Sequence, residues 1–331
     1  MAGRHTRRSF VKGALTAAGA AAIARSLEEQ VLLGQEAADA KAKPAAPPPR
    51  LEPGSKNTLP TGKLGDLKIS RLILGGNLIA GFAHSRELLY VSALLKHYFT
   101  EDKILETLEI AEAHGINCIN TNPGATKVIQ RYRKERASKI VWIVQGYPSA
   151  KDKFTGIQRS IDDGADAIYV QGNIADRMVE TKQVGLLGDV VQYIQARGLP
   201  AGIGGHSLDV PKACEAAGLQ PDFYVKTLHT TDYFSARRPN QPRSVIADRH
   251  DNFWCVDPAE TIEYMKKIAR PWIAYKVMAA GAIPPAKAFR HAFDGGADFV
   301  LAGMFDFQIA EDVRLAKDLL PKVKRDRPWR A

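Results

Sequence analysis

From Leu67 onward, short runs of apolar and β-branched residues alternate with segments whose apolar positions recur at helical spacing. Most of the short runs end in polar residues or glycine. They predict eight strands, at Arg71–Asn77, Ile116–Asn122, Ile140–Gly146, Ala167–Asn173, Ala201–His206, Phe223–His229, Trp272–Met278 and Phe299–Met304. Helical patterns separate them, most clearly at Glu101–His114, Glu260–Ala269 and Ala310–Leu320. Eight strand–helix units in about 270 residues indicate an α/β fold, a single parallel (β/α)8 TIM barrel.

The segments before the first strand divide the chain further. The stretch Gly62–Ile69 predicts a hairpin that closes the bottom of the barrel. Residues 41–61 are rich in Pro and Ala without apolar periodicity, which is typical of a semi-extended linker. We therefore expect a leader at 1–40, a linker at 41–61 and the barrel at 62–325.

The leader contains Thr6-Arg7-Arg8-Ser9-Phe10-Val11-Lys12, followed by a weakly apolar run at Gly13–Ala24. This resembles the twin-arginine signal. The resemblance implies export of the folded protein by the twin-arginine translocase, and a periplasmic or extracellular location. The apolar run is shorter and weaker than the ~20 strongly apolar residues of a transmembrane helix, so no stable membrane span is expected. An Ala-rich amphipathic helix is the alternative interpretation.

Charge and cysteine content argue against nucleic-acid binding and against cysteine-based sites. The net charge is +10, of which residues 1–50, with eight Lys/Arg and four Asp/Glu, supply +4. No basic stripe with interleaved aromatic residues is present in the sequence, so nucleic acid is not an expected partner. The three cysteines, Cys118, Cys214 and Cys255, form no CxxC motif, which argues against a disulfide framework and against a cysteine-rich metal or iron–sulfur site.

Several strand segments, in chain order, resemble the aldo/keto reductase superfamily. They are the hairpin and first strand at 62–77, Gly-Ile-Asn-Cys-Ile-Asn-Thr at 115–121, Gly-Ile-Gly-Gly-His at 202–206, Tyr-Lys-Val-Met-Ala-Ala-Gly at 275–281 and Val-Leu-Ala-Gly-Met at 300–304. The resemblance spans residues 62–320 and implies a TIM barrel with oxidoreductase activity. It also implies NADP(H) as cofactor, with Gly303 and Met304 at the cofactor-binding strand end.

The family reduces carbonyl groups with an Asp, Tyr, Lys and His tetrad. The corresponding positions here are Asn120, the neighbourhood of Ala125, Gln145 and Gln171, so this chain is a divergent member by resemblance. Asn and Gln do not titrate and cannot replace a general acid. Phe305-Asp306 follows Met304 where the family commonly has Arg-Asn, and an acidic residue would repel the 2′-phosphate of NADP.

The strand ends nevertheless carry polar residues suited to a small polar ligand. The carboxyl ends of parallel barrel strands meet at one mouth, where reactive sites are built. Carboxamides there pair well with sugar hydroxyls, and a long loop at Thr230–Asp257 adds aromatic residues among Arg and Asp. The predicted substrate-binding residues are Asn77, Asn120, Asn122, Gln145, Gln171, Asn173 and Trp254. Alternatively, the amides satisfy one another and buried water.

Three residues are candidates for the chemistry. Lys276 lies in an apolar strand, where it could act as a base, an electrophile or a Schiff-base nucleophile, or be a snorkelling or paired lysine. His229 and His206 are candidate bases, each with a structural role as the alternative. A metal site made by these histidines and a carboxylate such as Asp232, Asp257 or Glu260 lacks a compact motif, so no metal is predicted.

These observations favour an exported barrel that acts on a small polar carbonyl compound or sugar through a non-standard active site, with oxidoreductase activity expected from the resemblance. Two alternatives stay open. One is a catalytically inactive barrel that binds a sugar or a partner, and the other is a metal-dependent sugar lyase or isomerase.

Overall fold

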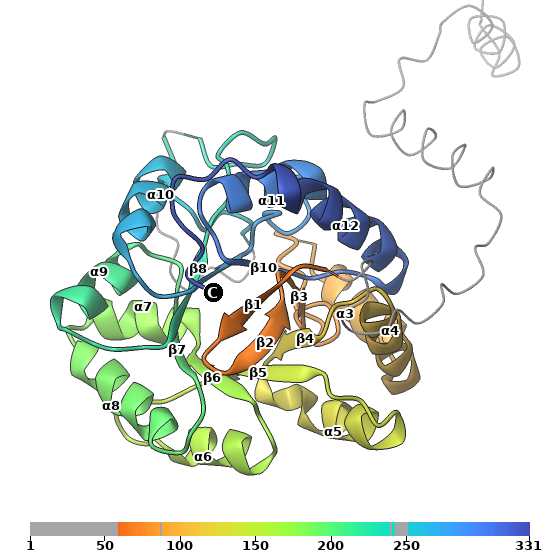
Figure 1. Ribbon diagram of the computed structural model, residues 1–331, viewed down its shortest axis with the longest axis horizontal. Coiled ribbons are helices and arrows are strands. Elements are labelled where there is room, and N and C mark those ends of the chain that lie inside the picture. The colour runs from red at the N-terminus through yellow and green to blue at the C-terminus, as the bar shows by residue number, and fades with distance from the viewer. Residues whose placement is uncertain (1–58, 87, 239, 242–250) are drawn as a thin grey trace, which may run out of the picture. The chain divides into compact units, whose positions relative to one another are not determined.

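The computed structural model describes residues 59–86, 88–238, 240–241 and 251–331. The predicted leader, and the linker up to residue 58, lie outside the described residues. Eight parallel strands close into a barrel in the order β10-β3-β4-β5-β6-β7-β8-β9, with helices arranged around it (Figure 1). The predicted (β/α)8 TIM barrel is therefore confirmed.

Each predicted strand is present, and all eight are shorter than predicted. The barrel strands are β3 (Leu72–Gly75), β4 (Cys118–Thr121), β5 (Val141–Gly146), β6 (Ala167–Val170), β7 (Ala201–Gly205), β8 (Phe223–Thr227), β9 (Trp272–Tyr275) and β10 (Phe299–Ala302). Sequence patterns extend the strands too far at their carboxyl ends because the polar residues there already belong to turns. Gln171, for example, caps the following helix by accepting a hydrogen bond from the backbone N–H of Ile174 at 3.2 Å.

The helices follow the strands, with long loops between β3 and α3 and between β8 and α10. They are α3 (Tyr90–Tyr98), α4 (Glu101–Ala113), α5 (Thr126–Glu135), α6 (Thr155–Asp162), α7 (Gly172–Glu180), α8 (Val184–Gln195), α9 (Asp209–Ala216), α10 (Pro258–Lys267), α11 (Pro285–Asp294) and α12 (Asp306–Leu319), with 3₁₀ turns at Pro123–Ala125 and Leu320–Lys322. The local sequence determines where α10 begins. Asp257 caps the helix by accepting a hydrogen bond from the Glu260 N–H at 2.8 Å, and Pro258 occupies the first turn.

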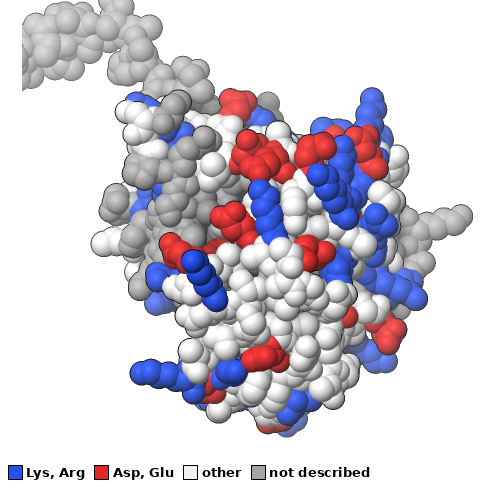
Figure 2. Space-filling view, turned by 90° about the vertical axis from the view of Figure 1, so that its left-hand side faces the viewer, with Lys and Arg blue, Asp and Glu red and all other residues white. Residues whose placement is uncertain are grey.

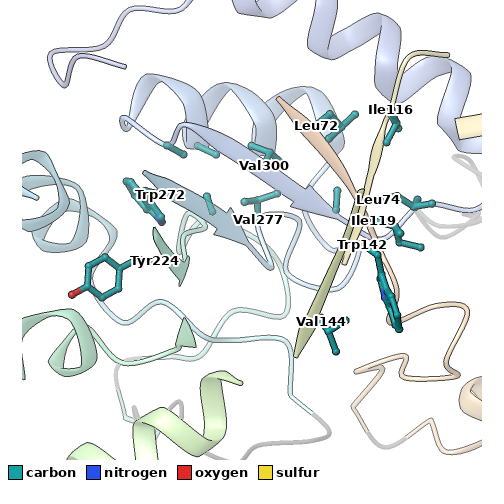
Figure 3. Packing of buried hydrophobic residues seen from close by; sticks show 14 of the residues in the cluster. Leu72, Leu74, Ile116, Ile119, Trp142, Val144, Tyr224, Trp272, Val277 and Val300 are labelled. Atoms are coloured by element: carbon teal, nitrogen blue, oxygen red, sulfur yellow. The ribbon is translucent and has the colours of Figure 1, made fainter. Parts of the chain in front are cut away.

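Strand side chains alternate between two apolar layers. One set faces the helices and includes Leu72, Leu74, Trp142, Tyr224 and Trp272 (Figure 3). The other set fills the barrel, and includes Ile73, Cys118, Ile143, Phe223 and Ile273. Because successive strand residues point to opposite faces, a strand buried on both faces is apolar along its whole length. The rigid, filled barrel leaves only its two ends for polar chemistry.

The amino-terminal end of the barrel is closed by the hairpin β1 (Thr61–Leu64) and β2 (Leu67–Ser70), whose Leu64 and Ile69 pack into the barrel core. The last residues of the chain pack at the same end. Asp298, fully buried, accepts hydrogen bonds from the Trp272 N–H (2.9 Å) and from the guanidinium of Arg327 (2.5 Å). The packed structure thus continues past residue 325.

On the face shown in Figure 2, Lys and Arg side chains are intermixed with Asp and Glu. Some charged side chains elsewhere pair along one helix, such as Arg314 with Asp318 on α12 at 3.4 Å. Within the described ranges, no helix is both long and apolar enough to cross a membrane.

Candidate functional site at the carboxyl mouth of the barrel

Lys276 follows the last residue of β9 and is held in the left-handed region with φ 57°. Its side chain is partly buried, and Nζ lies 3.7 Å from the centre of the Trp254 ring. Nζ is also 3.0 Å from Nε2 of His84, whose ring meets Trp254 edge-on with centroids 5.1 Å apart. No carboxylate forms an ion pair with Lys276 among residues 59–331 as far as they are described. The amine is therefore held by an aromatic face and an imidazole.

This environment makes Lys276 unusually acidic. Burial away from water disfavours the ammonium and lowers the pKa of Lys276 from 10.5 to about 7. A cation–π contact with Trp254 offsets part of that cost, since the indole face attracts the charged form. Near neutral pH a large fraction of the amine is then neutral, which is the form that can act as a nucleophile or a base.

Two long loops meet beside Lys276. Arg86, in the loop between β3 and α3, donates to the backbone carbonyl of Ser235 at 3.0 Å and contacts Asp251 and Asn252 at 3.3 Å each. Those partners lie in the loop between β8 and α10, which also supplies Trp254. Asp251 is in turn paired with Arg237 at 2.5 Å. These contacts of Arg86 join the two loops and hold His84 of the first loop against Trp254 of the second.

His206 ends β7 and forms a buried pair with Asp176 of α7. Nδ1 of His206 is 2.7 Å from the Asp176 carboxylate, which also accepts the backbone N–H groups of His206 and Ser207, each at 3.0 Å. Because a carboxylate only accepts, the proton of a neutral His206 resides on Nδ1 and Nε2 is left as an acceptor. Burial lowers the pKa of His206, and the charge of Lys276 lowers it further, although Asp176 opposes both effects.

The phenol of Tyr275 lies beside this pair. The rings of Tyr275 and His206 are 5.4 Å apart. Both side chains press against Gly172 at the start of α7, where an added Cβ would meet the Tyr275 hydroxyl at 2.5 Å and His206 at 2.9 Å. Glycine at this position therefore lets the imidazole and the phenol share one space.

His229 is engaged on both ring nitrogens by backbone groups. Nδ1 lies 2.8 Å from the carbonyl of Thr230, and Nε2 accepts the N–H groups of Trp254 (2.9 Å) and Cys255 (3.0 Å). This pattern requires a neutral ring that donates from Nδ1, and burial lowers the pKa of His229 to about 4. In this arrangement His229 positions the loop that carries Trp254.

The predicted amides Asn120 and Gln145 come together with two tyrosines. Asn120 Oδ1 accepts from Gln145 at 3.4 Å and from the buried Tyr169 hydroxyl at 3.3 Å, and its amide donates to the carbonyl of Ile143 at 3.2 Å. The hydroxyl of Tyr147 donates to Gln145 at 2.7 Å. This polar cluster occupies the ends of β4 to β6, and burial raises the pKa of Tyr169, so its phenol stays protonated.

The other predicted amides lie in the turns and helix starts that follow the strands. Asn122 accepts the Gly124 N–H at 2.8 Å and Gln171 caps α7, so both shape turns. Asn77 follows β3, where its backbone carbonyl accepts the Phe82 N–H at 2.8 Å, and Asn173 lies in the first turn of α7. The structure thus brings Asn120 and Gln145 together, whereas the side chains of Asn122 and Gln171 serve local backbone geometry.

A cavity of about 380 Å³ adjoins the Asn120 cluster on its outer side. Gln145 and Tyr147 form one wall, and α6 supplies Arg159 and Ser160, with Asp163 just after it. Tyr147 is 48% exposed, so its ring offers a flat surface to a ligand. The remaining lining residues are Pro123, Gly124, Thr126, Gly146 and Gly156.

The turn after β10 does not suit a phosphorylated nicotinamide. Gly303 is partly exposed and Met304 is buried, but Asp306 begins α12 and accepts from the Tyr98 hydroxyl (2.6 Å) and Lys103 (3.2 Å). Burial opposes ionisation, yet these two partners lower the pKa of Asp306 overall, so the helix start already holds an anion. A second anion such as a 2′-phosphate would be repelled there.

The carboxylates considered for a metal site are held elsewhere. Asp232 pairs with Lys287 at 2.9 Å, Asp257 caps α10, and Glu260 pairs with Lys212 at 2.6 Å. In the described part of the chain, no group of three or more His, Cys, Asp or Glu residues is arranged to hold a metal ion.

Sequence reasoning missed His84, Asp176, Tyr275 and a second buried lysine, Lys226, whose Nζ donates to the carbonyl (2.9 Å) and hydroxyl (2.8 Å) of Thr227. Asp176 has the pattern of an ordinary helix acid, and His84 lies in an irregular loop. Tyr275 carried a usable signal, because it shares strand parity with Ile273, which points into the barrel.

Comparison with solved structures places the barrel among known folds. Two structures of a candidate aldo-keto reductase from Pseudomonas aeruginosa match with TM-scores of 0.55 and 0.56, each at 18% identity. The first match covers 81% of this chain and 97% of the other, and the second covers 82% and 100%. No protein-family model and no curated protein matches the chain. At this identity the likeness shows that the two proteins share the TIM-barrel fold.

Proposed function

We propose that this protein is an exported enzyme that acts on a small polar carbonyl compound or sugar, using the Lys276 amine at the carboxyl mouth of its barrel. The observation that carries the proposal is the environment of Lys276, which lies against Trp254 and His84 with its pKa lowered to about 7 by burial. A neutral amine in a partly buried, aromatic-walled site is a nucleophile toward carbonyl carbon.

The first step is the formation of an imine. The Lys276 nitrogen adds to the carbonyl carbon, protons move to the carbonyl oxygen, and that oxygen leaves as water when the C=N bond forms. The neighbouring His206–Asp176 pair supplies a neutral imidazole whose Nε2 can take up a proton. Imine formation transfers no hydride, so this step needs no nicotinamide.

Reductive trapping tests this function. The full chain is incubated with dihydroxyacetone, pyruvate or D-glucose and sodium cyanoborohydride, and the modified lysines are mapped by peptide mass spectrometry. We expect an adduct at Lys276 that forms at pH 7 at least ten-fold faster than at the exposed Lys127, and that disappears in Lys276→Arg. Adducts distributed evenly over surface lysines would contradict the proposal.

The cavity beside Tyr147 favours a second candidate function, binding of a sugar without turnover. An exposed tyrosine ring next to Gln145, Arg159 and Asp163 offers stacking and hydrogen bonds to hydroxyl groups. If binding alone is the function, calorimetry with D-glucose and D-galactose should show binding that Tyr147→Ala weakens and Lys276→Arg leaves unchanged.

Export through the twin-arginine pathway is part of the proposal and rests on the Arg7-Arg8 motif. Replacing both residues by lysine should keep the precursor inside a bacterial host that exports the parent chain. Fractionation and immunoblotting measure this, and equal export of the two proteins would refute the assignment.

A further inference from the structure

We infer that the carbonyl compound carries a hydroxyl group on the carbon next to its carbonyl, and that Tyr275 together with the His206–Asp176 pair binds this hydroxyl. The inference rests on the proposed function of Lys276 and deepens it by naming the substrate class, α-hydroxycarbonyl compounds. Three features of the mouth lead to it: a phenol with no hydrogen-bond partner among the described residues, an imidazole whose proton is fixed on one nitrogen, and the position of Tyr275 directly before Lys276 in the chain.

The first feature is the Tyr275 hydroxyl, which is buried and has no hydrogen-bond partner among the described residues. Burial raises the pKa of Tyr275 well above its usual value, so the phenol keeps its proton and is a donor at any physiological pH. An unsatisfied buried hydroxyl costs ~1–3 kcal/mol. A ligand oxygen that accepts from it recovers that free energy.

The second feature is the polarity of His206. Asp176 accepts hydrogen bonds from two backbone N–H groups and from Nδ1, which fixes the imidazole proton on Nδ1 and leaves Nε2 as an acceptor. Tyr275 therefore offers a donor and His206 an acceptor. A hydroxyl group can accept from one and donate to the other, whereas a ketone oxygen or a carboxylate can only accept.

The third feature is the position of this pair relative to Lys276. Tyr275 and Lys276 are consecutive, and the left-handed backbone of Lys276 interrupts the strand alternation that would otherwise send the two side chains to opposite faces. Tyr275 is the last residue of β9, and its ring lies 5.4 Å from that of His206, so Lys276 directly follows a residue of this pair. Burial, and then the charge of Lys276, lower the pKa of His206, in agreement with that placement. We therefore assign the hydroxyl on the carbon next to the carbonyl to the Tyr275–His206 pair.

Reductive trapping with two matched ketones tests the inference. Hydroxyacetone and 2-butanone have the same shape and differ by a hydroxyl in place of a methyl group. Each is incubated with the full chain and sodium cyanoborohydride at pH 7, and the adduct at Lys276 is divided by that at Lys127 in the same digest, which removes the intrinsic reactivity of the ketone. We expect roughly a ten-fold preference for hydroxyacetone at Lys276.

The variant Tyr275→Phe should reduce this preference to about two-fold or less while 2-butanone still reacts, and Tyr90→Phe, on the exposed face of α3, should keep it. Thermal unfolding of Tyr275→Phe should be unchanged or slightly improved, because an unpaired hydroxyl is removed. Equal trapping of both ketones by the parent chain, a preference that survives in Tyr275→Phe, or a loss of stability in that variant would each overturn the inference. If neither ketone is trapped at Lys276, the proposed function fails and the inference fails with it.

Discussion

Replacing Lys276 by methionine should make the protein more stable at neutral pH and flatten its stability profile at higher pH. Methionine keeps the length of the side chain, is apolar, and packs well against an indole ring such as that of Trp254. The ammonium of Lys276 is instead removed from water, and its only described polar neighbour is His84, an uncharged or equally positive partner.

The sign follows from the direction of the pKa shift. The pKa of Lys276 is about 7 in the folded chain and 10.5 as the ordinary value, so between these limits the unfolded chain binds more protons than the folded one. Stability therefore rises with pH across this window and is lowest below pH 7. Lys276→Met has no ammonium to bury. Its free energy of unfolding should therefore exceed that of the parent most at pH 7 and below, and the difference should vanish near pH 10.5.

The same pKa shift sets an upper limit on the difference in stability between Lys276→Met and the parent. Each pH unit of displacement corresponds to ~1.4 kcal/mol, which gives an upper limit of about 5 kcal/mol. Lys276 is only partly buried, and water that reaches its ammonium screens the penalty, so we expect ~1–3 kcal/mol at pH 7.

Urea unfolding at pH 7, 8, 9 and 10 measures the difference between the parent and Lys276→Met. Lys226, whose pKa burial also lowers, contributes equally to both proteins and cancels in that difference. Lys127→Met, at an exposed position of α5, is the control and should track the parent. Equal stability of Lys276→Met and the parent at every pH would show that the lysine is not held away from water.

Three further predictions concern the surroundings of the site. Asp298→Asn should lower stability by ~3–5 kcal/mol in urea unfolding, because buried Arg327 would lose its counter-charge, whereas the exposed Asp318→Asn should change little; a loss below 1 kcal/mol would contradict the buried pairing. Arg86→Ala should loosen the contact between the two mouth loops and raise the pKa of Lys276 toward 10.5, read as the pH dependence of its acetylation by mass spectrometry; an unchanged profile would mean that Arg86 does not seal the site. His229→Phe should cost ~2–4 kcal/mol, since two buried backbone N–H groups would lose their acceptor, and a neutral result in the same unfolding assay would argue against that role.

The fold was largely predictable because strands buried on both faces leave a clear sequence pattern. Runs such as Ile-Ala-Tyr after Trp272 are short, apolar and bounded by polar residues, and eight of them in series admit few architectures. Strand ends were less predictable. Gln171 looks like a continuation of β6 in the sequence, but it caps α7, and only the path of the backbone decides between the two.

The candidate site was predictable in part. Lys276 and Asn120 stood out because polar groups in apolar strands need a reason to be there. His84 and Asp176 did not, since each gains its role from a partner far away in the sequence: His84 from Lys276, and Asp176 from His206. Such contacts depend on where the tertiary fold places loops and helices at the carboxyl end of the barrel, which a local sequence pattern does not indicate.

The closure at the amino-terminal end of the barrel has a consequence for when the protein can fold. Arg71, just before the first barrel strand, donates to the carbonyl of Ala331 at 2.7 Å and lies against the ring of Trp329, which Arg325 covers as well. The residue just before the first barrel strand is thus bound by a segment that lies more than 250 residues later in the chain. Closure of this end of the barrel is therefore a late step of folding, because the contact can form only after both segments have been synthesised.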